Sequence, residues 1–283
     1  MDDLDEDPGW SAAVADALTP AAGAILLQRT AGVVTVSLHR PERHNAVNLG
    51  MWTALGRLMP VLAAAEQVDV VVLRGTPGGP FSAGADISEF KALRSRPADA
   101  ERYGEAVAAG EGALLDFPKP TIALVQGWAI GGGTQLALAC DLRICDETAQ
   151  FAITPAKLGI VYSLASTGRL VDVVGASWAA WILLTGESLD AAAALRIGLV
   201  HEVTPAAEAE LRAGALARLL ATRARVSLTG AKALLGRVAR GARTDDASTQ
   251  DLYHRSYASA EYAEGVAAFL AKRPADFPAA RKR

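Results

Sequence analysis

Short, almost wholly apolar segments alternate with helical segments along the first two hundred residues, and this alternation limits the folds open to the chain. The run VDVVVLRG (68–75) has the continuous hydrophobicity of a strand covered on both faces. TIALVQ (121–126) and LRIC (142–145) have the same character, and residues 24–40 predict two strands joined by a turn at Ala31-Gly32. Strands that alternate with helices favour right-handed crossovers, so the sequence predicts an α/β fold with a layered core.

Three regions follow from the pattern along the chain. Residues 1–20 are acidic and rich in proline and alanine, which predicts a flexible N-terminal extension. Residues 21–204 contain all the predicted strands and are expected to form the core. Residues 205–283 have helical spacing without a convincing strand, so a C-terminal helical part is expected to follow.

The composition argues against several kinds of partner. A net charge of −3 over 283 residues does not suit nucleic-acid binding, which usually needs a basic surface. Cys140 and Cys145 are the only cysteines, and we expect both to be buried thiols because no cysteine–histidine spacing resembles a metal site. The uncharged stretch 121–140 contains four glycines and two glutamines and so makes a poor membrane span. With no signal-peptide pattern at the start, we expect a cytoplasmic protein without membrane, metal or separate cofactor.

Two loops of small residues follow predicted core strands, and each opens a helix. Gly131 to Gly133 separate strand 121–126 from a helix, and FSAGADISEF (81–90) follows strand 68–75. Such glycines serve either a tight turn with positive φ or the close approach of a ligand to bare backbone. If each loop supplies one N–H group, the pair forms an oxyanion hole, which stabilises negative charge on a carbonyl oxygen.

Over about residues 24–278 the chain resembles the enoyl-CoA hydratase/isomerase (crotonase) superfamily. The resemblance rests on LHRPERHNAVN (38–48), FSAGADISEF, KPTIALVQGWAIGGGTQLALACDLRI (119–144) and FLAKRPADF (269–277). It implies a crotonase-like spiral of ββα units with a C-terminal helical part that assembles a homotrimer or a dimer of trimers. It also implies an acyl-CoA substrate in fatty acid or acyl-CoA metabolism, whose thioester carbonyl lies between two N–H groups while an enolate forms.

The resemblance assigns roles to individual residues. The two N–H donors are Ala85 and Gly132. Phe269 and Lys272 match positions that reach the nucleotide end of CoA, often in a neighbouring subunit; helix packing and a solvated helix end are their alternative roles. Asp86 is also expected to cap the helix that begins beside it. The full set expected to line the CoA channel is His44, Asn45, Ala46, Ser82, Ala83, Gly84, Asp86 and Ile87.

The sequence departs from the family at both usual catalytic glutamates. Gln135 occupies one of these positions, and Pro155, in TPAKLG (154–159), occupies the other. A glutamine can orient water, but it does not act as a general base near neutral pH. Hydration needs a base and an acid, so the resemblance implies an oxyanion hole without the family's usual proton-transfer groups.

Three functions therefore stay open. The first is an enoyl-CoA hydratase or isomerase. The second is a decarboxylase of methylmalonyl-CoA-like substrates, in which loss of CO₂ generates the enolate and Tyr162, at a position where such enzymes carry tyrosine, donates the proton. The third is a non-catalytic acyl-CoA-binding protein. The remaining carboxylates near the motifs, Glu89, Glu105 and Glu111, lie on predicted helices, and we expect them to be solvated.

Overall fold

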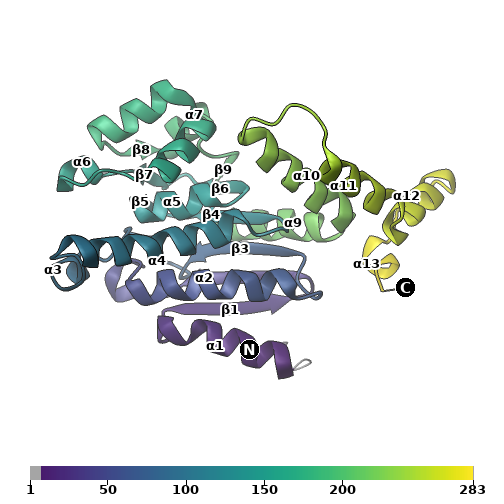
Figure 1. The fold of residues 1–283 in the computed structure, drawn as a ribbon, viewed down its shortest axis with the longest axis horizontal. Helices are drawn as coiled ribbons and strands as arrows, with labels where there is room; N and C mark the ends of the chain where they lie inside the picture. The colour runs from purple at the N-terminus through teal and green to yellow at the C-terminus, as the bar shows by residue number, and fades with distance from the viewer. Residues whose placement is uncertain (1–7, 283) are drawn as a thin grey trace.

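The computed structural model describes residues 8–282, and a six-stranded sheet lies at its centre (Figure 1). The strand order is β1-β2-β3-β4-β6-β9, with an antiparallel hairpin of β1 and β2 and parallel pairing between all other neighbours. The hairpin turn at Ala31-Gly32 and the predicted α/β core are confirmed. The strands are β1 (Ile25–Thr30), β2 (Val33–Leu38), β3 (Val70–Gly75), β4 (Thr121–Val125), β6 (Leu142–Asp146) and β9 (Glu202–Thr204).

Helices cover both faces of this sheet, as the apolar strands require. Along β3, Val71 belongs to the core cluster that contains the buried side chains of α2 (Leu49–Ala64). The next residue, Val72, points to the opposite face and packs with alanines of α9 (Ala209–Ala221). Successive strand residues point to opposite faces, so a run of consecutive valines fits a strand buried on both sides.

A second, three-stranded sheet was not predicted from the sequence. It consists of β5 (Trp128–Ile130), β7 (Gln150–Ala152) and β8 (Leu189–Asp190). β5 lies within the segment that the sequence analysis treated as one glycine turn. Strands of two or three residues are too short to display an alternating pattern, which explains the omission.

The remaining helices of the core include α4, which packs along α2, and several short helices. They also include α7, which is interrupted at Gly175 (φ 75°, ψ 161°). By length and composition alone, α7 is the one helix among residues 8–282 that reaches the size of a bilayer span, and 22 % of its apolar window is buried. The bounds are η2 (Pro41–Arg43), η3 (Ile87–Glu89), α3 (Phe90–Leu93), α4 (Pro97–Leu115), α5 (Gly132–Ala139), α6 (Pro155–Leu158), α7 (Leu164–Thr185) and α8 (Ala191–Arg196).

The expected flexible N-terminal extension is wrong for residues 8–20. This part forms α1 (Pro8–Leu18) and a 3₁₀ turn, η1 (Thr19–Ala21), and α1 packs along α2. Its buried residues are Trp10, Val14 and Ala17, whose spacing of four and three places them on one side of a helix. The acidic and proline-rich composition concealed this apolar stripe. Residues 1–7 lie outside the described part of the chain.

The predicted C-terminal helical part is confirmed, and most of it extends away from the core as an arm (Figure 1). The arm consists of α10 (Arg225–Ala239), α11 (Ala247–Tyr257), α12 (Ala260–Leu270) and α13 (Phe277–Ala280). Arg225 ties it to the core, because its guanidinium lies 2.7 Å from carboxylate oxygens of both Glu66 and Asp69. The role of this part in trimer formation stays a prediction.

Candidate active site

The two small-residue loops meet at the carboxyl edge of the large sheet. One loop follows β3, and the other follows β4 and the short strand β5. Because β3 and β4 are parallel neighbours, both segments leave the large sheet at the same edge. Hydrogen bonds of the backbone then join them. The N–H of Ser82 donates to the carbonyl of Trp128 (2.8 Å), and the N–H of Ile130 donates to the carbonyl of Ser82 (3.0 Å).

The glycines of these loops provide positive φ, as expected, and they also allow one loop to pack closely against the other. Gly131 has φ 51° and Gly84 has φ 96°, backbone conformations that residues other than glycine rarely adopt. A Cβ at Gly84 would lie 2.5 Å from the carbonyl oxygen of Ile130, and one at Gly133 would lie 2.7 Å from that of Ser82. The two loops therefore pack backbone against backbone, closer than any side chain permits.

This packing brings Ala85 and Gly132 side by side. A Cβ at Gly132 would lie 3.3 Å from the backbone nitrogen of Ala85. Neither N–H group donates to an acceptor within residues 8–282, and both residues line one cavity of about 410 Å³. Gly132 is also the first residue of α5, where the helix dipole favours negative charge. The predicted proximity of Ala85 and Gly132 is confirmed, and two unused backbone donors lie beside the same cavity.

The remaining cavity wall suits an acyl chain. Its surface is mainly apolar and is built from both loops, α4 and the segment that connects α6 to α7. Of the residues predicted to line the CoA channel, Ala83, Gly84 and Ile87 belong to this wall. The other apolar or aromatic residues of the wall include Trp52, Phe90, Tyr103, Val107, Leu115, Ile130, Leu158, Ile160 and Val161.

Gln135 and Tyr162, the other two predicted catalytic residues, line the same cavity. The Nε2 of Gln135 donates to Ser166 Oγ (2.9 Å) and to the carboxylate of Glu111. The hydroxyl of Tyr162 is buried and makes no hydrogen bond of good geometry in the described part of the chain, although the nearby side chain of Ser166 acts to lower its pKa. Burial and the nearby charge of Glu111 raise the pKa of Tyr162 far above neutrality, so its phenol stays protonated.

Glu111 is the residue of the site that the sequence analysis missed. We expected it to be solvated with Glu89 and Glu105, but its exposed fraction is only 5 % and it lines the cavity. A signal was available in the sequence. Tyr103 and Val107 precede Glu111 by eight and four residues, so Glu111 lies on the inward face of α4. Glu105, by contrast, is exposed as expected.

The carboxylate of Glu111 is held at one oxygen only. Its Oε2 accepts hydrogen bonds from Ser166 Oγ (2.9 Å) and from Gln135, whereas no protein donor within residues 8–282 contacts Oε1. Burial raises the pKa of Glu111. The two hydrogen bonds and the positive charge of Arg169 oppose this shift without reversing it. The site therefore contains a carboxyl group with elevated proton affinity and one free oxygen.

Several predicted CoA-binding residues use their side chains to hold the loops together. Asn45 is fully buried; its Nδ2 donates to the carbonyl of Pro80 (2.7 Å), and its own carbonyl accepts from Ser82 Oγ (2.8 Å). The carbonyl of Ala46 accepts from Arg40 (2.8 Å). These contacts fix the backbone that carries the cavity wall, and direct contact of the three residues with CoA stays a prediction.

Asp86 and His44 also lie outside the cavity wall. Asp86 accepts from the N–H of Ser88 (3.1 Å) as the predicted helix cap and pairs with Arg40 (2.8 Å). Burial opposes ionisation of Asp86, but the hydrogen bonds from Ser88 and Arg40 outweigh it and lower the pKa. The ring of His44 meets Trp128 edge-on at 5.5 Å, beside a separate hollow of about 330 Å³.

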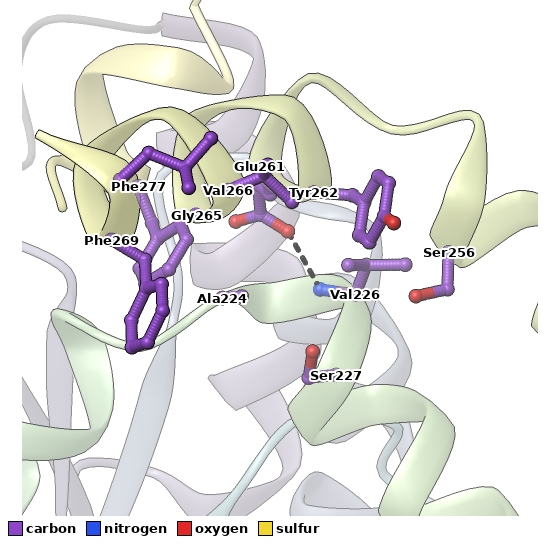
Figure 2. A pocket seen from close by; sticks show the side chains of 11 residues that line it. Ala224, Val226, Ser227, Ser256, Glu261, Tyr262, Gly265, Val266, Phe269 and Phe277 are labelled. Carbon is purple, nitrogen blue, oxygen red and sulfur yellow. Dashed lines mark hydrogen bonds between the residues drawn. The ribbon is translucent and has the colours of Figure 1, made fainter.

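Phe269 and Lys272 lie on the C-terminal arm and do not line the cavity. Figure 2 shows Phe269 beside Phe277 in an apolar groove of about 430 Å³ between α10 and α12. Glu261 also lines this groove and accepts from the N–H of Val226 (2.8 Å). Phe269 is 83 % exposed, so ordinary packing within one chain does not account for it. The predicted contact of both residues with CoA stays untested.

Within residues 8–282, no group of three or more histidine, cysteine or acidic side chains is arranged to hold a metal ion. Cys140 and Cys145 are both free and buried, as predicted. Burial raises the pKa of each thiol to about 12, so both stay protonated and unreactive near neutrality.

Comparison with known proteins places the chain in a family. The family model for enoyl-CoA hydratase/isomerase matches residues 28–280. The chain belongs to the enoyl-CoA hydratase/isomerase family. Among its relatives, the 2,3-dehydroadipyl-CoA hydratase of Escherichia coli is 33 % identical over 256 residues, covering 89 % of this chain and 98 % of the relative.

Solved structures agree with the family assignment. An enoyl-CoA hydratase/carnithine racemase from Magnetospirillum magneticum superposes with a TM-score of 0.86 at 32 % identity, over 90 % of this chain and 95 % of that one. An enoyl-CoA hydratase from Mycobacterium smegmatis superposes with a TM-score of 0.82 at 30 % identity, over 90 % of this chain and 99 % of that one. The fold is therefore that of the crotonase superfamily, as the sequence motifs implied.

Proposed function

We propose that this family member binds an acyl-CoA thioester and stabilises its enolate between the N–H groups of Ala85 and Gly132. The observation that carries the proposal is the pair of unused N–H donors at the cavity, which two separate loops hold side by side. A thioester oxygen between these donors gains hydrogen bonds that strengthen as negative charge develops. Each such donor contributes about 3 kcal/mol to a transition state.

The acyl-CoA substrate class is supported by the family and by the shape of the site. The cavity is largely apolar beyond the two donors, which suits the hydrocarbon of an acyl chain. The Escherichia coli relative is named for a CoA thioester substrate. Within this class we favour an enoyl-CoA hydratase or isomerase reaction in fatty acid or acyl-CoA metabolism, with CoA as part of the substrate and no separate cofactor.

Decarboxylation of an acyl-CoA is the second candidate, and Tyr162 supports it. Tyr162 lines the cavity, and its protonated hydroxyl is buried without a hydrogen bond of good geometry in residues 8–282. An enolate made by loss of CO₂ needs a proton donor and no base, and a phenol meets that need. Non-catalytic binding of acyl-CoA is the third candidate, because the oxyanion hole is built from backbone and does not depend on the missing glutamates.

One set of measurements separates these functions. Calorimetry with butyryl-CoA measures binding, and three assays measure hydration of crotonyl-CoA, isomerisation of 3-hexenoyl-CoA and decarboxylation of methylmalonyl-CoA. We expect binding, with turnover of at least one enoyl-CoA. Decarboxylation alone would favour the second candidate, and binding without turnover the third. If butyryl-CoA does not bind at all, the proposed function is wrong.

We also propose a cytoplasmic homotrimer or dimer of trimers that binds neither membrane nor nucleic acid. The support is the set of large apolar side chains that the single chain leaves exposed on α7 and on the C-terminal arm, namely Leu164, Trp181, Leu184, Leu235, Tyr257, Tyr262, Phe269 and Leu270. Multi-angle light scattering tests the assembly. A mass of one chain at micromolar concentration would contradict it.

A further inference from the structure

We infer that Glu111 takes the proton from the α carbon of the substrate and returns it, so that α4 carries the catalytic carboxylate of this protein. The inference rests on the proposed function, because proton removal at this carbon needs an oxyanion hole for the resulting enolate. It places the acid–base group at neither of the two positions where the family pattern has glutamate, since those positions hold Gln135 and Pro155.

Glu111 is the only carboxylate among the described residues that line the cavity. Its position relative to the oxyanion hole follows from Gln135, which lies one helical turn after Gly132 on α5 and donates to Glu111. The Glu111 carboxylate therefore lies beside the Gln135 side chain, one helical turn from the oxyanion-hole residue Gly132. Its free Oε1 is the oxygen available to a substrate proton, because Oε2 already accepts two hydrogen bonds.

The neighbours of Glu111 hold it in this orientation. Ser166, buried on α7, donates to Oε2 and accepts from Gln135 (2.9 Å). Ser163 lies 2.7 Å from Ser166 and completes the chain of hydrogen bonds. Gln135 is thus a positioning residue. A glutamate in its place would put a second negative charge within hydrogen-bond distance of Glu111, which explains why an amide suits this position.

The reaction balances with one carboxylate. The Glu111 carboxylate removes the α proton of a 3-enoyl-CoA, and the electrons of that C–H bond form a dienolate whose charge lies on the thioester oxygen. The N–H groups of Ala85 and Gly132 bind that oxygen. The Glu111 carboxylic acid then delivers the proton to the γ carbon, the carbonyl re-forms and the double bond moves to the α,β position. No water is added, and the carboxylate is regenerated.

This chemistry selects isomerisation over hydration. Adding water across a double bond needs a base for the water and an acid for the α carbon at the same time. The cavity provides one carboxylate, which suits a proton that leaves one carbon and returns to another. The groups that face Glu111 are Gln135 on α5, Ser166 and Arg169 on α7 and Tyr162, which precedes α7.

The test uses exchange of the α protons of butyryl-CoA in D₂O, followed by NMR, together with isomerisation of 3-hexenoyl-CoA. Glu111→Gln keeps an oxygen that can accept from Gln135 and Ser166. We expect this variant to lose at least about 100-fold in both rates, because general-base catalysis contributes about 10²- to 10⁴-fold. Its dissociation constant for butyryl-CoA should stay within about threefold. The matched control is Glu105→Gln, an exposed carboxylate six residues earlier on α4, which should behave as wild type.

The outcomes separate this inference from the proposed function. If wild-type protein fails to bind butyryl-CoA, the proposed function fails and the inference fails with it. If wild type binds but neither exchanges nor isomerises, the role of Glu111 is wrong while acyl-CoA binding stands. Wild-type rates in a folded Glu111→Gln protein would likewise overturn the role of Glu111.

A second variant, Gln135→Leu, tests the positioning role. The hydrogen bond from Gln135 lowers the proton affinity of Glu111, so its loss should move the rising limb of the exchange rate to higher pH. The maximal rate should fall while KM changes little. A side chain with a merely structural role would leave the midpoint of that limb in place, and an unchanged midpoint would contradict the inference.

Discussion

A single methyl group at Gly132 tests the oxyanion hole with little disturbance of the fold. In Gly132→Ala, the new Cβ lies 3.3 Å from the backbone nitrogen of Ala85 and 3.1 Å from Cζ2 of Trp52. An oxyanion held by the hole needs to lie about 2.7 to 3.1 Å from each donor nitrogen. The methyl group therefore occupies the neighbourhood in which the thioester oxygen has to lie.

The expected loss follows from the value of one donor. Displacing the oxygen from one N–H group costs about 3 kcal/mol, which corresponds to a 10²- to 10³-fold lower kcat/KM. The fold should tolerate the change, because Gly132 has no positive φ; as the first residue of α5 it should gain less than the ~1 kcal/mol by which alanine exceeds glycine in a helix interior. The tight contact with Trp52 offsets part of that gain.

The assay is α-proton exchange of butyryl-CoA, with urea unfolding measured in parallel. Gly168→Ala on α7 is the matched control, because a Cβ there meets open space. We expect the control to exchange at the wild-type rate. If Gly132→Ala is folded and exchanges the α protons of butyryl-CoA at a rate within threefold of wild type, the thioester carbonyl is not polarised at this site and the reasoning is refuted.

Three further predictions concern stability. The pKa of Glu111 is raised above its unfolded value of about 4.5. The wild-type protein should therefore lose stability relative to Glu111→Gln as the pH rises from 4.5 through the folded pKa. A difference in the free energy of urea unfolding that does not change with pH would contradict this. Arg225→Ala should lower the free energy of unfolding by about 2 kcal/mol, less than the 3–5 kcal/mol typical of a buried pair, because Arg281 still contacts Asp69. The same variant should speed amide hydrogen exchange in α10 to α13. Unchanged exchange in these helices would show that Arg225 does not hold the arm to the core. Trp10→Ala should cost about 3 kcal/mol in urea unfolding without changing acyl-CoA affinity, and a loss below about 1 kcal/mol would show that α1 does not support the core.

Local sequence signals predicted the parts of the fold that are long enough to show a pattern. The strands around Val71 and Ile122 were evident because strands covered by helices on both faces are continuously apolar. The short strand Trp128–Ile130 was not evident, because three residues display no period. At the N-terminus, the acidic and proline-rich composition predicts flexibility, but the helical spacing of Trp10 and Val14 indicates a helix, and the prediction of flexibility was wrong.

The candidate site shows the same division. The loops that carry Ala85 and Gly132 were predictable because close backbone packing restricts the sequence to small residues. The burial of Glu111 depends instead on how α4 packs against α5, which the loop motifs do not specify. Its place on the apolar face of α4, four residues after Val107, was the available signal. A carboxylate on such a face is expected to have a polar partner, and Gln135 is that partner.

A crystal structure with butyryl-CoA bound tests the central claim most directly. The account predicts that the thioester oxygen lies about 2.7 to 3.1 Å from the backbone nitrogens of both Ala85 and Gly132, with Oε1 of Glu111 facing the α carbon. A thioester oxygen that contacts neither nitrogen, with the acyl chain outside the cavity between α4 and α5, would contradict it.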